Sequence, residues 1–394
     1  MLFDRQVYDD RLRRAADAAA AEGFAALLVA DPANLYYLTG YDAWSFYMPQ
    51  VLLLDADTAE ATFLLREMDA NGAHRITVPG VELVGYPERL VHRRDEHPGD
   101  WMAAWLRERG DAERYRGGVV GYEGEAHFFA VRTFRAFAEG LPEWTLRDCQ
   151  GTVNRVRLRK EDREIELMRG AGRIVSNCMA VAVDAIRAGA RQNDVAAEIL
   201  AAQARGVGEI EGDYTAIVPM LPTGEAADTP HLTYSASRFR DGEGVSIEIA
   251  AAHRRYHAPL ARTVALGRVH PDLERLGDVT AEGLDKVLAA VRPGVTAGEV
   301  AEVYWRHLAD HGLEKASRLG YSIGIGYPPD WGEGTASIRI GDETVLERNM
   351  TFHVIAGMWQ TGYGCELSES IAVTEDGVEV LTDAPRALIR KAGA

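Results

Sequence analysis

The residue with the clearest chemical potential in this chain is a carboxylate that stands inside an apolar strand. Residues 246–250 read Ser-Ile-Glu-Ile-Ala, and the alternation of a strand places Glu248 on the same face as Ser246 and Ala250. Because this face holds only small neighbours, it is either exposed to solvent or the floor of a binding site. A second short strand follows and ends near Thr263, so the pattern predicts a hairpin that presents an acid. The alternative is an ordinary exposed glutamate.

The elements before this hairpin predict a separate domain. Short apolar runs alternate with amphipathic segments up to about residue 148, which is typical of an α/β domain. We therefore expect a first domain over residues 1–150 and a second domain, which carries the hairpin, over residues 151–394. The expected elements of the first domain are helices at 5–22, 95–109 and 126–140 and strands at 25–30, 51–55, 61–65 and 117–122. Those of the second are helices at 162–186, 195–205, 273–291 and 297–311.

Composition narrows the class of protein. The 394 residues are 47% hydrophobic and 26% charged, as in an ordinary globular protein. With 43 Lys and Arg against 60 Asp and Glu, the net charge of −17 argues against a nucleic acid or an anionic membrane as partner. The N-terminal segment is charged throughout, and no run is long and apolar enough to span a membrane. The three cysteines have no metal-binding spacing, so we expect a reduced, cytoplasmic protein.

Several stretches resemble the pita-bread hydrolases, which include creatinase, prolidase and methionine aminopeptidase. The stretch 31–45, DPANLYYLTGYDAWS, is similar to the NxxYLTGF stretch of their N-terminal domains, and the hairpin with Arg262-Thr263 is similar to their first metal-ligand hairpin. The resemblance implies an α+β chain, with an N-terminal creatinase-type α/β domain followed by a C-terminal pita-bread domain.

The metal ligands of that family have no counterparts here. When the motifs are matched, the five ligand positions fall on Glu248, Pro259, Tyr321, Ile355 and Ser368. One carboxylate among apolar and hydroxyl side chains cannot hold two metal ions. The resemblance therefore implies a member without a metal site and without any cofactor.

Longer stretches resemble one metal-free group, the ectoine hydrolases. The runs are 39–50 (TGYDAWSFYMPQ), 320–333 (GYSIGIGYPPDWGE) and 349–377, and the likeness extends over nearly the whole chain. It implies hydrolysis of the cyclic amidine ectoine to N-acetyl-diaminobutyrate. Two alternatives stay open: a hydrolase or lyase acting on another osmolyte, such as creatine or dimethylsulfoniopropionate, and a non-catalytic ligand-binding protein.

The resemblance also implies roles for polar residues. Glu248 would act on the ring carbon, either as a nucleophile or as a general base for water. His231, at the place of a family histidine, and His353 would move protons. Strand alternation places His353 on the face of Ile355, and it places Glu366, rather than Glu369, on the face where an amidinium nitrogen would be held.

Aromatic rings would bind the flat cation of a zwitterionic substrate. The candidates are Tyr41, Trp44, Phe46, Tyr47, Tyr321, Tyr327, Trp331 and Trp359. The first four form a loop that, in creatinase-like homodimers, covers the site of the other subunit, so we expect a homodimer. The substrate carboxylate could be held by Arg66, Arg262 or Arg339, and the sequence does not decide among them.

Overall fold

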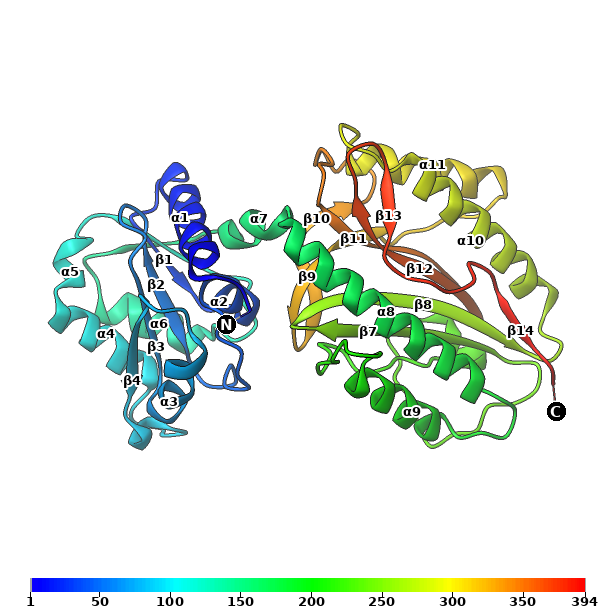
Figure 1. Cartoon of the computed structure of the whole chain (residues 1–394), viewed down its shortest axis with the longest axis horizontal. Helices are drawn as coiled ribbons and strands as arrows, with labels where there is room; N and C mark the ends of the chain where they lie inside the picture. Colours follow the sequence, from blue (N-terminus) through cyan, green and yellow to red (C-terminus); the bar gives the residue numbers. More distant parts are fainter. Residues whose placement is uncertain (1, 394) are drawn as a thin grey trace. The chain divides into compact units, whose positions relative to one another are not determined.

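The computed structural model describes residues 2–393, and these form two compact units divided between Arg157 and Leu158. The helix α7 (Thr152–Leu158) spans the boundary between them (Figure 1). Each unit has its own sheet and its own hydrophobic core. The units are therefore described one at a time.

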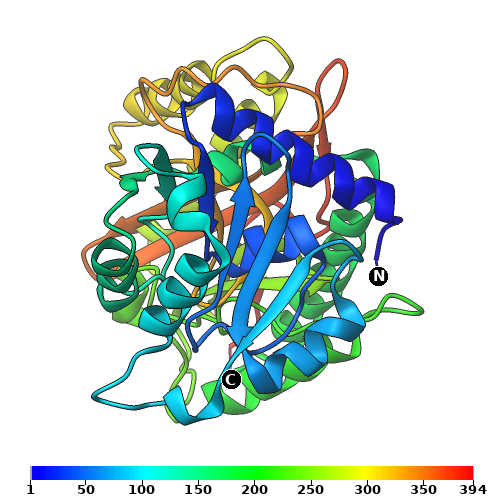
Figure 2. The ribbon, with the colours of Figure 1, turned by 90° about the vertical axis from the view of Figure 1, so that its left-hand side faces the viewer.

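The N-terminal unit contains a six-stranded sheet in the order β4-β3-β2-β1-β5-β6. Its strands are β1 (Ala26–Val29), β2 (Val51–Asp55), β3 (Ala61–Arg66), β4 (Glu82–Tyr86), β5 (Val119–Tyr122) and β6 (Thr145–Asp148). The hairpin β2–β3 and the pair β1–β2 are antiparallel, and the other pairs are parallel. The helices are α1 (Arg5–Ala21), α2 (Pro32–Thr39), α3 (Glu67–Ile76), α4 (Pro98–Arg109), α5 (Asp111–Arg114) and α6 (Val131–Gly140) (Figure 2).

Two helices of this unit begin later than the sequence predicted. Helix α4 begins at Pro98 rather than at residue 95, because proline fits the first helical position and the ring of His97 accepts a hydrogen bond from the Gly99 amide at 3.0 Å. Helix α6 begins at Val131 rather than at residue 126, since the backbone before it is used in two successive turns.

The C-terminal unit is built on an eight-stranded sheet in the order β13-β12-β11-β9-β8-β14, with β7 paired to β8 and β10 paired to β9. The strands are β7 (Gly244–His253), β8 (Tyr256–Leu266), β9 (Gly320–Tyr327), β10 (Asp330–Ile338), β11 (Thr351–Gln360), β12 (Tyr363–Val373), β13 (Val378–Val380) and β14 (Ile389–Lys391). The helices are α8 (Asp162–Ala185), α9 (Gln192–Arg205), α10 (Pro271–Ala290) and α11 (Ala297–Asp310).

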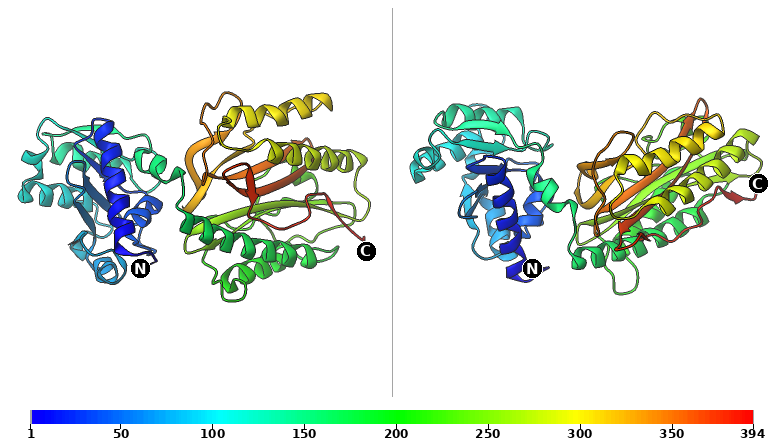
Figure 3. Two further views of the ribbon diagram at one scale, coloured as in Figure 1. Left: turned by 45° about the horizontal axis from the view of Figure 1, so that its top comes forward. Right: turned by 90° about the horizontal axis from the view of Figure 1, so that it is seen from above.

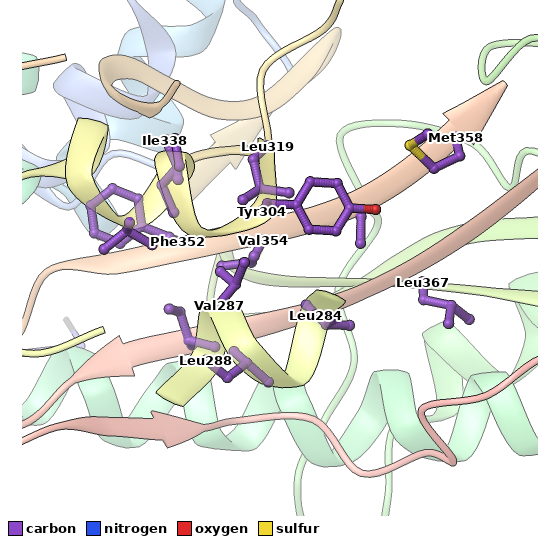
Figure 4. Close-up of a cluster of buried hydrophobic side chains, with 14 of the residues drawn as sticks. Leu284, Val287, Leu288, Tyr304, Leu319, Ile338, Phe352, Val354, Met358 and Leu367 are labelled. Atoms are coloured by element: carbon purple, nitrogen blue, oxygen red, sulfur yellow. The ribbon is translucent and has the colours of Figure 1, made fainter. Parts of the chain in front are cut away.

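Two hydrophobic cores fix which face of this sheet the helices cover. Ile247 and Ile249 of β7 pack with α8 and α9, while Val354 of β11 and Leu367 of β12 pack with α10 and α11 (Figures 3 and 4). Because neighbouring strand residues point to opposite sides, the residues between these apolar ones lie on the face away from the helices. The apolar alternation around Glu248 therefore places this carboxylate as the sequence predicted.

The turn between β7 and β8 is unusual, because both of its central residues are arginines with positive φ. Arg254 and Arg255 have φ of 50° and 67°, a conformation that glycine or asparagine usually supplies. The buried guanidinium of Arg255 lies between the rings of Tyr214 and Tyr327, 3.8 and 4.5 Å from their centroids. It also donates to the carbonyls of Tyr214 and Gly326, so it ties the hairpin to two neighbouring segments.

Strands β8 and β12 are joined by side chains in a seam. The Thr263 hydroxyl accepts a hydrogen bond from the Glu366 amide at 2.8 Å, and the Ser368 hydroxyl accepts one from the Ala261 amide at 2.6 Å. On the helix side of the same seam, the fully buried Arg262 pairs with Glu369 at 2.6 Å and donates to the Ser368 carbonyl.

We expect Arg262→Met to lower the free energy of unfolding by about 3–5 kcal/mol, because it leaves Glu369 as a buried charge without its main partner. Urea denaturation measures this change. Arg306→Met, which removes an exposed pair with Glu302, is the matched control and should have a small effect. Adding Glu369→Leu to Arg262→Met should recover much of the loss; a double variant less stable than the single one would contradict the electrostatic explanation.

Candidate functional site

Two carboxylic acids are buried together on the face of the C-terminal sheet that the helices do not cover. Glu248 comes from β7 and is 5% exposed, and Glu366 comes from β12 and is 1% exposed. Burial raises the pKa of Glu248 well above its ordinary value, and the charges of Glu366 and Asp330 raise it further. Burial also raises the pKa of Glu366, to about 8. One Glu366 oxygen, Oε2, has no hydrogen-bond partner among the described residues.

A buried lysine, Lys315, lies close enough to Glu366 to act on its charge. The Lys315 ammonium lies 4.7 Å from the centre of the Trp359 ring and donates hydrogen bonds to the Gly357 carbonyl at 2.5 Å and to the Ser317 hydroxyl at 2.8 Å. Its charge lowers the pKa of Glu366 and so partly offsets the effect of burial on that acid. Burial in turn lowers the pKa of Lys315 to about 8. The indole nitrogen of Trp359, like Glu366 Oε2, has no partner within the described chain.

A chain of hydrogen bonds runs from β10 to β12 beside the acids. The Trp331 indole N–H donates to the Tyr321 hydroxyl at 2.8 Å, and this hydroxyl lies 3.0 Å from Nδ1 of His353. The other nitrogen of His353, Nε2, lies 2.7 Å from the Ser368 hydroxyl. Trp331 and His353 are completely buried. This arrangement fixes the Tyr321 ring and orients the imidazole.

The environment of His353 suits a neutral, positioning imidazole. Burial, assisted by the charge of Arg318, lowers the pKa of His353 to about 3, and both ring nitrogens are bound to hydroxyls. The predicted role of His353 in moving protons is therefore not the one that its contacts favour. Its predicted position beside Ile355, on the face of Glu366, agrees with the strand pairing of Ile355 with Ser368.

The residues at the five metal-ligand positions do not fit a metal site. Glu248 is the only carboxylate among them, and Ser368 uses its hydroxyl to bind the Ala261 amide and the His353 ring. Within residues 2–393, no group of three or more His, Cys, Asp or Glu side chains is placed to hold a metal ion. The donor chemistry of this face therefore does not suit the metals of the resembling family.

The remaining predicted residues of the C-terminal unit lie farther along the same sheet or at its margin. Tyr327 is buried against the Arg255 guanidinium. His231 is exposed in the segment after the short 3-10 helix η2 (Gly224–Asp228). Isolated β-bridges of the backbone connect that segment to the site. Thr233 pairs with Met220, and Met220 pairs with Glu248. The role of His231 stays a prediction.

The four aromatic candidates from 41–48 belong to the N-terminal unit. Tyr41 and Phe46 are buried there, Tyr41 bound to Ser45 at 2.7 Å and Phe46 stacked near Phe128. In this unit both rings pack into the interior, and their predicted contact with a substrate stays a prediction. Trp44 and Tyr47 are 58% and 53% exposed. That they border the site of a second subunit in a homodimer stays a prediction.

Sequence reasoning missed three charged residues near the acids: Lys315, Arg318 and Asp330. The guanidinium of Arg318 lies 4.4 Å from the centre of the Tyr321 ring. Lys315 and Arg318 both lie on the segment between α11 and β9. Two cations shortly before Gly320-Tyr321 were the sequence signal that could have identified them as site residues. Asp330 begins β10 and is exposed.

A search of the helices in residues 2–393 finds none that is both long and apolar enough to cross a membrane.

Comparisons with known proteins identify the two units. Residues 11–159 match the creatinase/prolidase N-terminal domain, and residues 166–375, more than half of the chain, match metallopeptidase family M24. A relative named ectoine hydrolase, from Halomonas elongata, is 40% identical over 99% of this chain and 98% of its own length. A probable dipeptidase, PepE of Mycobacterium tuberculosis, is 27% identical over 98% of this chain and 97% of its own length.

Solved structures share the fold. A prolidase from Thermococcus sibiricus superposes with a TM-score of 0.84 at 20% identity, covering 98% of this chain and 99% of the prolidase. Together with the family matches, this confirms the predicted creatinase-type domain followed by a pita-bread domain. The chain is a member of metallopeptidase family M24.

Proposed function

We propose that this protein hydrolyses ectoine to N-acetyl-diaminobutyrate without a metal ion. The named relative from Halomonas elongata supports the substrate, because the likeness extends over nearly the whole of both chains. The buried pair of acids, Glu248 and Glu366, carries the proposal. It supplies negative charge for a cationic substrate on the face where M24 metallopeptidases hold metal.

The charge of the acid pair matches an amidinium. Two buried carboxyl groups are difficult to ionise together, as the raised pKa values of Glu248 and Glu366 indicate. An amidinium would stabilise the ionised form of Glu248, and Glu366, whose Oε2 has no partner among the described residues, would stay protonated beside it. The Tyr321 and Trp359 rings lie at the same site, and the faces not covered by Arg318 and Lys315 could bind a flat cation.

The reaction adds one water to the ring carbon between the two nitrogens and breaks one carbon–nitrogen bond. Glu248 would either attack this carbon itself, to be released later by water, or take a proton from the attacking water. Glu366 would give a proton to the nitrogen that leaves, which becomes the free amine of the product. A pKa of about 8 suits this donor, because a useful fraction is protonated near neutral pH.

The donor chemistry of the five metal-ligand positions supports the proposed metal independence. Pro259 and Ile355 offer no side-chain ligand, and the Ser368 hydroxyl is used in the seam. In the proposed reaction the bound amidinium balances the charge of the ionised Glu248 while Glu366 is protonated, so no positive metal is required.

Incubation of the purified protein with ectoine, creatine and dimethylsulfoniopropionate, read by mass spectrometry, tests the function. We expect product of one added water from ectoine alone, at the same rate with and without a strong chelator. Turnover of creatine or dimethylsulfoniopropionate instead would favour the other osmolyte functions, and binding without turnover would favour a non-catalytic protein. Activity that disappears in chelator and returns with added metal would overturn metal independence.

Glu248→Gln keeps the shape of the side chain and removes its charge. If Glu248 acts on the ring carbon, single-turnover rates at saturating ectoine should fall on the order of 10⁴-fold. Binding should weaken less, since the aromatic faces and Glu366 remain. A variant that still turns over within about tenfold of the parent, which is too small a loss for a nucleophile or base, would remove Glu248 from the mechanism.

The same reaction distinguishes the two roles of Glu248. A covalent intermediate would add the mass of bound substrate to the peptide that contains Glu248 after rapid acid quench. If no such mass appears while turnover is fast, Glu248 acts as a general base.

The proposed acid predicts a pH dependence. The rate constant kcat/KM should fall as the pH rises through about 8, because Glu366 loses the proton it must donate. Lys315→Met removes the ammonium that lowers the pKa of Glu366. The falling limb of the profile of kcat/KM against pH should therefore move to higher pH. Lys286→Met, on the exposed surface of α10, is the control and should leave the limb in place. A limb that moves to lower pH in Lys315→Met would contradict the assignment.

A further inference from the structure

The carboxylate of a zwitterionic substrate needs a cation. Of the three arginines suggested by the sequence, two are already occupied by other partners. Arg262 is fully buried on the helix side of the seam, where Glu369 and several carbonyls occupy its guanidinium. Arg66, in the N-terminal unit, is bound to Glu88 through two of its nitrogens. Arg339 is exposed just after the end of β10.

Arg318 has the position that the other arginines lack. Its guanidinium stacks on Tyr321, 4.4 Å from the ring centre, and one nitrogen, Nη1, donates to the Ser337 hydroxyl at 3.2 Å. The residue is exposed, so the remaining N–H groups can be reached by a ligand. Tyr321 is bound to His353, which places this cation beside the same face as Glu366.

Lys315 is less suited to this task, although it lies on the same segment. It is 8% exposed, and its ammonium already donates to the Gly357 carbonyl and the Ser317 hydroxyl. Its charge acts on Glu366. The two cations of the segment therefore differ in accessibility: Lys315 neutralises a buried acid, and Arg318 presents a fork of donors at the surface.

We propose that Arg318 binds the substrate carboxylate and thereby orients the ring, with the amidinium end toward Glu248 and Glu366. This inference rests on the proposed function. An arginine can hold a carboxylate through two parallel N–H donors, which fixes direction as well as position. Stacking on Tyr321 keeps the guanidinium plane in place before the substrate arrives. A zwitterion then meets a cation at the surface and acids in the interior.

The test compares two substrates in two proteins. One is ectoine, and the other is its descarboxy analogue, the same methyl-substituted ring without the carboxylate. In Arg318→Gln, kcat/KM for ectoine should fall about 10- to 100-fold, whereas kcat/KM for the analogue should change little. The preference of the wild-type enzyme for ectoine should therefore largely disappear. Arg318→Lys, which keeps the charge but loses the fork, should restore part of it. Arg339→Gln is the matched control and should keep the full preference.

An equal loss on both substrates would overturn the proposal, because it would mean that Arg318 only supports Tyr321. If the wild-type protein hydrolyses neither compound, the proposed function fails, and calorimetry still decides the role of Arg318. Ectoine should then bind the wild-type protein more tightly than the analogue does, and Arg318→Gln should remove that difference. A difference in affinity that persists in Arg318→Gln would also overturn the proposal.

Discussion

The seam between β8 and β12 determines the geometry of the site. Ala261 is paired with Glu248 across the hairpin and donates its amide to Ser368, while Thr263 accepts from the Glu366 amide. The backbone positions of both acids are therefore tied to a single strand. The Arg262–Glu369 pair holds the opposite side of the same seam in the interior. Because a buried pair is costly to break, this side resists separation of the two strands.

The two acids placed in this way raise the electrostatic cost of ionising each other. Each is buried, and the charge of Glu366 raises the pKa of Glu248. The charge of Lys315 offsets part of this cost at Glu366. A cationic ring would complete the charge balance, so the electrostatic cost of burying the two acids together becomes a preference for the proposed ligand. M24 metallopeptidases use metal ions on this face, and here the positive charge would come from substrate.

The sequence was informative where a pattern is local. The alternation around Glu248 predicted its face, because alternation depends only on residue type at fixed spacing. The same reasoning could not find Lys315 and Arg318, since their approach to Trp359 and Tyr321 depends on how a loop returns over the sheet. It also grouped Tyr41 and Phe46 with Trp44 and Tyr47, because a run of aromatic residues does not reveal which rings point into a core.

The neutral imidazole of His353 has one further consequence. Such a ring carries one proton on one nitrogen and a lone pair on the other, so one of its two hydroxyl neighbours must donate to it and the other must accept. Exchange between its two tautomers would therefore reverse the hydroxyls of Tyr321 and Ser368 together. In one arrangement the phenol proton of Tyr321 is donated to Nδ1 of His353. In the other arrangement this proton can be donated to a bound substrate. The polarity of this side of the site can thus be inverted with no change in its net charge.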